Sequence, residues 1–274
     1  MASNPPSHQP TRHQPTRREF LGSVVLPGAV GAAAPRLDPT RSPPQVASRA
    51  LDAEHLAHDE DYWREVQQAY TVDRSLIYLN SGGTSPSPIG VQRAMTRRLA
   101  VMNEAPSHNM WQVQEKQIEA VRAAVAQFAG TSVDEIAFTR NASESLQTVQ
   151  FGFDLAAGDE VLCSDQDYPR MLNTFRQRER RERIRLVTVP LPAATTAEFD
   201  DEVVRRYAAA ITGRTKLILV THMINLTGQV LPAKRIVAEG RKRDVPVLVD
   251  GAHSFAHFPF RLAELDCDYF GTSL

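Results

Sequence analysis

The sequence predicts an α/β fold with a mostly parallel sheet that is covered by helices on both faces. From about residue 135 to the end, short apolar runs alternate with helical stretches, which is typical of a largely parallel sheet. Several runs, such as LILV at 217–220, are apolar on consecutive positions, as expected for strands that are buried on both faces. With 42% hydrophobic and 23% charged residues, the composition is that of an ordinary globular domain.

The part of the chain before residue 135 predicts helices and one short strand. Residues 51–70 have a helical pattern, and SLIYLN at 75–80 predicts a strand that ends in the Gly/Pro/Ser turn SGGTSPSP. Two helices are predicted next, from about Ile89 to Asn103 and from about Trp111 to Ala129. Gly130 is expected to end the second of them.

Six strands are predicted after residue 130, with helices between them. The strands are EIAFT, DEVLCS, IRLVTVP, KLILVTH, VPVLVD and DYFGTSL, and the helices begin near Ala142, Pro169, Phe199, Pro232 and Ser254. Ligands of such sheets bind beyond the carboxyl ends of the strands. The residues that directly follow each strand are therefore the candidates for a site.

Charge and cysteine content exclude several kinds of function. The chain has 31 basic and 32 acidic residues and a net charge of -1, so a nucleic-acid-binding surface is not predicted. The run from Arg176 to Arg185 interleaves glutamates and fits a solvated helix face with ion pairs. Cys163 and Cys267 stand in no metal-binding pattern, so no metal site is predicted; two buried thiols are favoured, and a disulfide between them stays open.

Residues 1–50 are predicted to be an export signal followed by a disordered linker. Arg17 and Arg18 precede Phe20, and an apolar stretch that ends in small residues at 32–34 follows. This order resembles a bacterial twin-arginine export signal, which predicts a periplasmic or exported protein. The alternative is a chance arginine pair in a disordered tail. The apolar stretch contains Pro27 and is too short for a membrane span.

The polar residues at the strand ends suit a phosphorylated, electron-poor ring. Ala142 and Ser143 begin a helix, where free N–H groups favour a phosphate. Tyr168 offers a flat face for stacking. Asp250 follows a very apolar strand, and a buried carboxylate needs a cation such as a protonated pyridine nitrogen.

Two further residues complete the predicted ring site. Asn225 and His253 could both donate a hydrogen bond to a phenolic oxygen on the same ring. Each candidate also has a plain structural explanation when taken alone: a helix cap for Ser143 and Asp250, a turn for Asn225, and core packing for Tyr168.

The motifs YLNSGGTSPSP, FTRNASES, DQDYPR, THMINLTGQVLP, VDGAHS and DYFGTSL together resemble the class V aminotransferase family. These are pyridoxal-phosphate enzymes of fold type I, which include isopenicillin-N-epimerase-like proteins and cysteine desulfurases. The resemblance runs from about Ile77 to the last residue. It implies pyridoxal 5'-phosphate as cofactor, an amino acid or amine as substrate, and a homodimer.

The resemblance also implies a role for each site residue. Phosphate contacts fall to Ala142, Ser143 and Ser273, ring stacking to Tyr168, the ring oxygen to Asn225, and the pyridine nitrogen to Asp250. His253 stands where many members have Gln, and the turn that borders the substrate, often across a dimer interface, is Gly82, Gly83 and Thr84.

In this family a His-Lys pair follows the last matched motif, and the lysine forms the Schiff base with the cofactor. The sequence stops at Leu274, before that position, and its four lysines are Lys116, Lys216, Lys234 and Lys242, none of which follows a predicted strand. We therefore expect residues 51–274 to be an incomplete cofactor-binding large domain with an N-terminal helical segment. The small C-terminal domain is expected to be absent, and the chain to be inactive as written.

Two alternatives stay open beside this fragment of an aminotransferase or epimerase. One is a genuine short protein that binds the cofactor or a partner without catalysis. The other is an α/β domain that is unrelated to the cofactor. Tyr168 is typical of the epimerase-like branch, and neither cysteine suits the reactive cysteine of a desulfurase.

Overall fold

The computed structural model describes residues 53–192 and 197–274, so the predicted export signal around Arg17 and Arg18 lies outside the described residues. The described chain forms two compact units. The first contains residues 53–72 and 88–90, and the second contains residues 73–87 and the described residues from 91 to 274.

The first unit holds two helices where the sequence predicts one. Helix α2 (Ala53–Ala57) ends before helix α3 (Glu60–Gln68) begins. The break is at Asp59, whose side chain accepts hydrogen bonds from the N–H groups of Asp61 and Tyr62. Aspartate is a favoured N-cap residue because its carboxylate satisfies N–H groups that the first turn leaves free.

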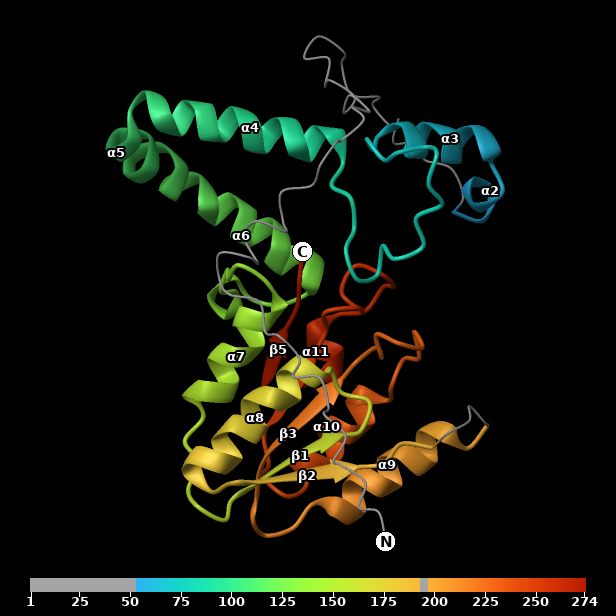
Figure 1. The fold of residues 1–274 in the computed structure, drawn as a ribbon, viewed down its shortest axis with the longest axis vertical. Coiled ribbons are helices and arrows are strands. Elements are labelled where there is room, and N and C mark those ends of the chain that lie inside the picture. The colour runs from blue at the N-terminus through green and yellow to red at the C-terminus, as the bar shows by residue number, and fades with distance from the viewer. Residues whose placement is uncertain (1–52, 193–196) are drawn as a thin grey trace, which may run out of the picture. The chain divides into compact units, whose positions relative to one another are not determined.

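The second unit contains a sheet of five parallel strands, which confirms the predicted fold class. The strands are β1 (Glu160–Ser164), β2 (Arg185–Val189), β3 (Thr215–Thr221), β4 (Val247–Asp250) and β5 (Tyr269–Gly271). Their order in the sheet is β2-β1-β3-β4-β5, and all four neighbouring pairs are parallel (Figure 1).

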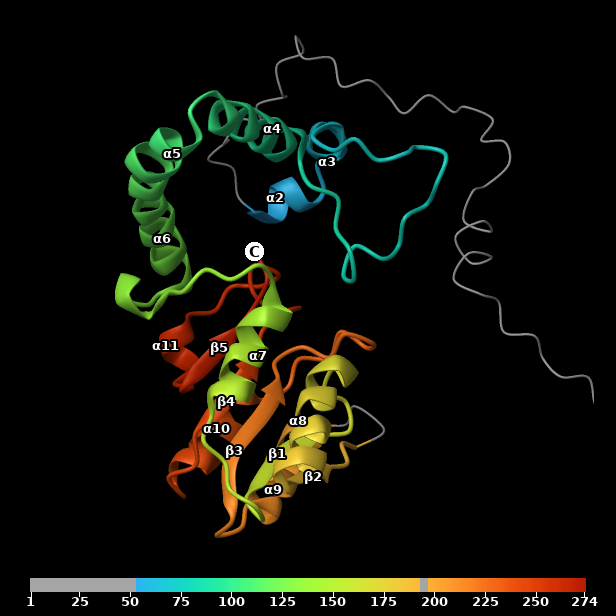
Figure 2. The ribbon, with the colours of Figure 1, turned by 60° about the vertical axis from the view of Figure 1, so that its left-hand side comes forward.

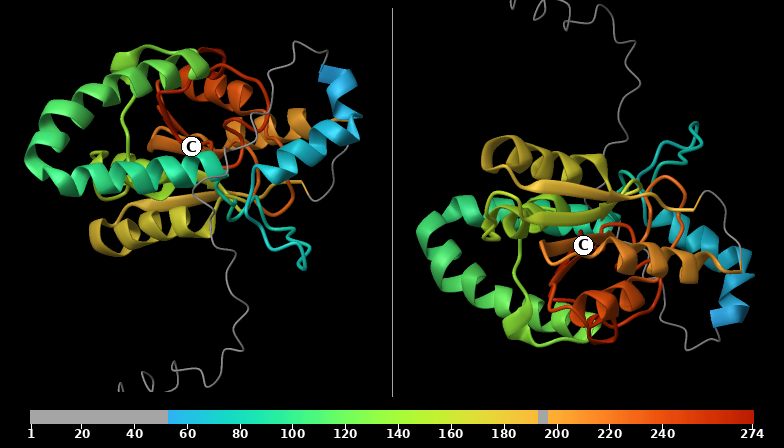
Figure 3. Two further views of the ribbon diagram at one scale, coloured as in Figure 1. Left: turned by 90° about the horizontal axis from the view of Figure 1, so that it is seen from above. Right: turned by 90° about the horizontal axis from the view of Figure 1, so that it is seen from below.

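Helices cover both faces of this sheet (Figure 2). One face packs against α7 (Ala142–Gly152) and α8 (Pro169–Glu182), and the other against α9 (Phe199–Ala210) and α10 (Ala233–Arg241). Figure 3 shows α8 and α9 on opposite sides of the strands.

The alternation of side chains along β3 explains its unbroken apolar run. Leu217 and Leu219 belong to the cluster that includes α7 and α8, whereas Ile218 and Val220 belong to the cluster with α9 and α10. All four are fully buried. Since each such side chain contributes about 1.5–3 kcal/mol on burial, the two faces together supply much of the core.

A run of helices, called the helical hairpin here for its turn at α5, precedes the sheet in the sequence. It consists of α4 (Ile89–Glu104), the single turn α5 (Pro106–His108), a π-helical turn (Asn109–Gln114) and α6 (Glu115–Ala129). Gly130 ends α6 with a φ of 72°, as predicted, because this left-handed conformation favours glycine.

Two predicted strands do not form. The segment 75–80 lies exposed, with Ile77 and Leu79 both 89% accessible, and 135–139 contains the end of a 3-10 turn, Val133–Glu135, followed by unpaired chain. Neither takes part in the described sheet. A strand needs a neighbour for its backbone N–H and C=O groups, and the described residues supply none at these places.

The helix predicted near Ser254 is also absent, and hydrogen-bonded turns take its place. Phe255 N–H bonds to the carbonyl of Gly251, but Ala256 has a φ of 63°. A left-handed residue stops a right-handed helix. The next helix is the short α11 (Leu262–Leu265).

Candidate functional site

The carboxyl ends of four neighbouring strands form one rim of the sheet, and the predicted site residues follow them. Tyr168 comes after β1, Asn225 after β3, Asp250 ends β4, and Ser273 follows β5. Because all of these strands are parallel, their carboxyl ends lie at the same edge. The structure therefore brings together residues from separate parts of the chain.

The start of α7 meets the end of β5 at this rim. Asn141 caps α7, and its side chain accepts the N–H of Glu144 at 2.9 Å. Ser143 is therefore not the cap, which leaves its hydroxyl free of that structural duty. The N–H of Ala142 donates to Ser273 Oγ at 3.3 Å across 131 residues of sequence. A helix N–H group and the Ser273 hydroxyl thus meet where an anion is favoured.

Gly271 makes this meeting of α7 and β5 close enough. A Cβ at this position would lie 2.7 Å from Leu146 Cδ2 and 2.9 Å from Ser145 Oγ. Only glycine allows β5 to approach the helix so closely, and Ser273 follows two residues later.

Asp250 is a buried carboxylate with little internal compensation. The residue is 5% exposed, and its Oδ1 accepts a hydrogen bond from the N–H of Ala252 at 3.0 Å. Burial raises the pKa of Asp250 to about 6. In the described part of the chain no cationic side chain forms an ion pair with it. A cationic ligand would therefore relieve an uncompensated cost.

His253 and the predicted substrate-side turn lie near each other. A Cβ on Gly82 would lie 3.8 Å from His253 Nδ1. Gly83 and Thr84 continue the same exposed turn, and their N–H groups both donate to the carbonyl of Asn80. Burial lowers the pKa of His253, and His257 lowers it further, so the imidazole is a neutral hydrogen-bonding group near pH 7.

Tyr168 and Asn225 occupy the other end of the rim. Tyr168 directly precedes α8, is half-buried, and packs against the apolar cluster under α7 and α8. Asn225 lies on the exposed loop after β3, where Gly228, with a φ of 71°, donates to the carbonyl of Ile224. The turn explanation for this loop is thus correct, and it leaves the Asn225 side chain accessible to a ligand.

Two buried polar residues of the rim were not predicted from the sequence. Asp167 is 2% exposed, and its carboxylate accepts from the Ser164 N–H, the Ser164 hydroxyl and the Thr221 N–H. An acidic residue directly before Tyr168 in a strand-end motif was the available signal. His222 lies 3.0 Å through Nδ1 from Ser254 Oγ, and burial lowers its pKa to about 4.

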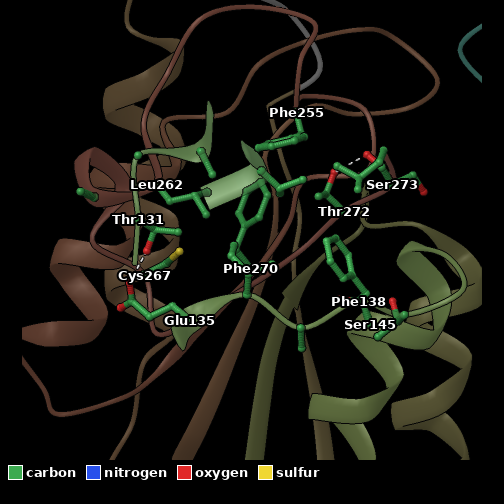
Figure 4. Close-up of a pocket in the computed structure, with 18 of the residues that line it drawn as sticks. Thr131, Glu135, Phe138, Ser145, Phe255, Leu262, Cys267, Phe270, Thr272 and Ser273 are labelled. Carbon is green, nitrogen blue, oxygen red and sulfur yellow. Dashed lines mark hydrogen bonds between the residues drawn. The ribbon is translucent and has the colours of Figure 1, made fainter. Parts of the chain in front are cut away.

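A cavity of about 710 Å³ opens beside β5 and α6, between Phe138 and Phe270 (Figure 4). Ser273 lines one end of it, but Tyr168, Asn225 and Asp250 do not. It therefore adjoins the predicted phosphate end of the site, and these predicted ring contacts lie outside its lining.

Both cysteines are free thiols, so the disulfide that the sequence left open is absent. Burial raises the pKa of Cys163 to about 12 and that of Cys267 to about 11. Neither is a thiolate near pH 7, which makes both poor nucleophiles.

The four lysines take no part in the rim. Lys216 is the second residue of β3, at the end of the strand opposite the rim. Lys116 donates to Gln112, and Lys242 forms an ion pair with Glu239 at 2.6 Å. Lys234 lies exposed in the first turn of α10.

The sequence model of the family "Aminotransferase class-V" matches residues 77–274 of this chain. The chain belongs to the class V aminotransferase family. This membership confirms the resemblance in the sequence motifs and agrees with the parallel sheet. Among the described residues, no helix is long and apolar enough to cross a membrane.

Named members of the class V aminotransferase family resemble the chain over most of its length. It is 32% identical to isopenicillin N epimerase of Amycolatopsis lactamdurans, over 77% of this chain and 53% of that protein. It is 27% identical to a probable cysteine desulfurase of Halalkalibacterium halodurans, over 72% of this chain and 49% of that protein. The chain thus spans about half the length of the curated relatives it matches.

A solved structure of a C-DES mutant supports both the fold and the cofactor. It superimposes on this chain with a TM-score of 0.64 at 26% identity, over 71% of this chain and 51% of that one. Its name states that glycine is covalently linked to the PLP cofactor. The predicted cofactor, pyridoxal 5'-phosphate, is therefore confirmed at the level of the family.

Proposed function

We propose that this chain binds pyridoxal 5'-phosphate at the strand-end rim and forms the cofactor-binding part of an enzyme that acts on an amino acid or amine. The observation that carries this proposal is Asp250, a buried carboxylate at the end of β4 with no cationic partner in the described chain. A protonated pyridine nitrogen is a cation of the right size and chemistry for that position.

The residues of the rim divide the work by their chemistry. Asp250 holds a proton on the ring nitrogen, which keeps the ring electron-poor. Tyr168 stacks on the ring, and Asn225 and His253 donate to its phenolic oxygen. When bound, the cofactor supplies an electron sink for negative charge at the substrate's α-carbon.

The phosphate is held at the other end of the site. The N–H groups of Ala142 and Ser143 at the start of α7 and the hydroxyls of Ser143 and Ser273 are the proposed ligands. The bond between the Ala142 N–H and Ser273 Oγ supports this assignment, because it places a helix N–H and a hydroxyl, which would both hold a phosphate, next to each other. Gly82, with Gly83 and Thr84, borders the substrate beside His253.

Within these residues, we propose that the cofactor binds without a covalent bond. None of the four lysines lies among the rim residues, so no side-chain amine is placed to reach the cofactor aldehyde. Borohydride treatment of the loaded chain followed by mass spectrometry tests this: we expect no pyridoxyl group on any lysine, and a labelled Lys234 would contradict the assignment.

The type of reaction is proposed from the relatives and from the two thiols. The chain is more similar to an isopenicillin N epimerase than to the desulfurase named above. Cys163 and Cys267 are protonated near pH 7 and make poor nucleophiles. An aminotransferase or epimerase reaction therefore fits these residues better than sulfur transfer.

The experiment that tests the cofactor site is equilibrium dialysis of the chain against pyridoxal 5'-phosphate. We expect saturable binding at one site per chain, and a loss of about tenfold or more in affinity when Asp250→Asn removes the charge that pairs with the ring. The matched control is Asp165→Asn, an exposed acid that also accepts one backbone N–H, from Leu191. Equal affinity in the two variants would contradict the proposed site.

We also propose a homodimer and export through the twin-arginine signal. Exposed apolar side chains on the helical hairpin, including Met95, Leu99 and Trp111, support a dimer because such surfaces are usually covered. Sedimentation analysis tests the dimer.

Export is tested by fusing residues 1–50 to a reporter and replacing Arg17 and Arg18 with lysines, which should keep the reporter in the cytoplasm.

A further inference from the structure

We infer that Asp167 is a positioning residue of the cofactor site, which ties the ends of β1 and β3 together so that Tyr168 and the Asn225 loop meet the ring correctly. This inference rests on the proposed cofactor site. Asp167 is not itself a proposed ring contact. It acts through the two chain segments that it joins.

Both oxygens of the Asp167 carboxylate accept hydrogen bonds. Oδ2 accepts from the Ser164 N–H at 2.6 Å and from the Ser164 hydroxyl at 2.9 Å, and Oδ1 accepts from the Thr221 N–H at 2.8 Å. Ser164 is the last residue of β1 and Thr221 the last of β3. One side chain therefore fastens the ends of two neighbouring strands.

The bond to Thr221 continues the sheet beyond its backbone ladder. The paired residues of β1 and β3 run only to Leu162 and Ile218, so Asp167 supplies an acceptor where β1 no longer does. On its other side Thr221 pairs with Asp250 of β4. Thr221 thus lies between the Asp167 clamp and the carboxylate that faces the ring nitrogen.

The two segments that Asp167 joins carry the proposed ring contacts. Tyr168 is the next residue in the sequence, so the torsions of Asp167 set where the aromatic ring stands. The loop that begins after Thr221 carries Asn225. The phosphate ligands on α7 and after β5 belong to other elements and are not fastened by this carboxylate.

Burying a carboxylate is energetically unfavourable, and the three hydrogen bonds of Asp167 explain why this side chain is present. Burial raises the pKa of Asp167 to about 7, and the nearby carboxylate of Asp250 contributes to this rise. An asparagine could not replace it, because its NH2 group would face a donor in either orientation: the N–H and hydroxyl of Ser164 in one, the Thr221 N–H in the other. A carboxylate is the side chain that accepts all three bonds at once.

The test compares Asp167→Asn with the control Asp165→Asn, whose carboxylate lies on the same turn but is exposed and accepts only from Leu191. Affinity for pyridoxal 5'-phosphate is measured by equilibrium dialysis, and inorganic phosphate is used as a competitor that probes the phosphate end alone. The circular dichroism of the bound cofactor reports how the ring is held.

We expect Asp167→Asn to weaken binding of pyridoxal 5'-phosphate about tenfold, the effect of losing one charge-assisted contact, and to change the dichroism of the bound ring. The inhibition constant of inorganic phosphate should stay unchanged, because a merely structural defect would weaken both. Asp165→Asn should alter neither quantity.

Two results for Asp167→Asn would overturn the inference. The first is equal cofactor affinity in Asp167→Asn and the unaltered chain. The second is a parallel loss of phosphate affinity, which would make Asp167 a general stabiliser of the fold. If Asp167→Asn does not fold, the milder variant Ser164→Ala, which keeps the charge and removes one donor, tests the inference instead.

For Ser164→Ala we expect a loss of about threefold in cofactor affinity with unchanged phosphate inhibition, and full affinity would contradict the inference. Failure of the unaltered chain to bind the cofactor at all is a different result. It would refute the proposed cofactor site, and this inference with it.

Discussion

The buried carboxylate of Asp250 should make the protein less stable near neutral pH than a variant without that charge. Burial raises its pKa from 3.8 to about 6, a difference of about two units, and each unit corresponds to about 1.4 kcal/mol. The charged form of Asp250 therefore costs the folded chain roughly 3 kcal/mol above pH 6. Asp250→Asn keeps an oxygen for the Ala252 N–H and removes the charge.

The pH range of this effect follows from the two pKa values. Since the folded pKa is raised, the unfolded chain ionises first, and stability is lost as pH rises from about 4 to about 6. At pH 8 we expect Asp250→Asn to exceed the unaltered chain by about 2–3 kcal/mol in free energy of unfolding. At pH 4 this difference should disappear.

Urea denaturation followed by circular dichroism at pH 8 and pH 4 measures both values, with Asp165→Asn as control. Saturating pyridoxal 5'-phosphate should stabilise the unaltered chain more than the variant, because only the former offers a charge to the ring nitrogen. If Asp250→Asn were no more stable than the unaltered chain at pH 8, the carboxylate would have to be compensated by another partner, and the reasoning would be refuted.

Two further predictions concern neighbouring parts of the site. Gly271→Ala would place a Cβ 2.7 Å from Leu146 Cδ2; we expect a loss of about 1–3 kcal/mol in unfolding free energy and weaker phosphate binding through Ser273, and a variant as stable as the parent would contradict this. His222 has a pKa lowered to about 4 by burial, so below pH 6.5 the unfolded chain gains a proton that the folded chain refuses. Stability should therefore fall between pH 6.5 and 4 by up to about 3 kcal/mol, and His222→Asn should flatten that part of a pH titration, whereas an unchanged profile would contradict the assignment.

The strands of the sheet could be predicted because burial on both faces produces a recognisable pattern in the sequence. The runs around Leu217 and Val249 are apolar on consecutive residues, which few other structures require. The segments 75–80 and 135–139 have a strand-like composition too. A strand also needs an adjacent strand to pair with, and the local composition does not show whether one is present. That is why both predictions of a strand were wrong.

The candidate site was predictable only where a residue's chemistry is visible from its position at a strand end. Asp250 ends one apolar strand and Ser273 comes two residues after another, and the structure places both at one rim. Asp167 was missed because its meaning lies in a bond to Thr221, 54 residues further along the chain. The cap of α7, Asn141, was not predicted because Ser143, two residues later, is also a favoured cap residue.

The bond between Ala142 and Ser273 has a consequence for how the protein is made. The helix end that is proposed to hold the phosphate is synthesised before its partner hydroxyl, because the five strands of the described sheet are translated between the two. A nascent chain cannot complete the site until β5 has joined the edge of the sheet. At the proposed site, cofactor binding then follows the docking of β5, and the amount of bound cofactor measures the fraction of chains in which β5 has joined the sheet.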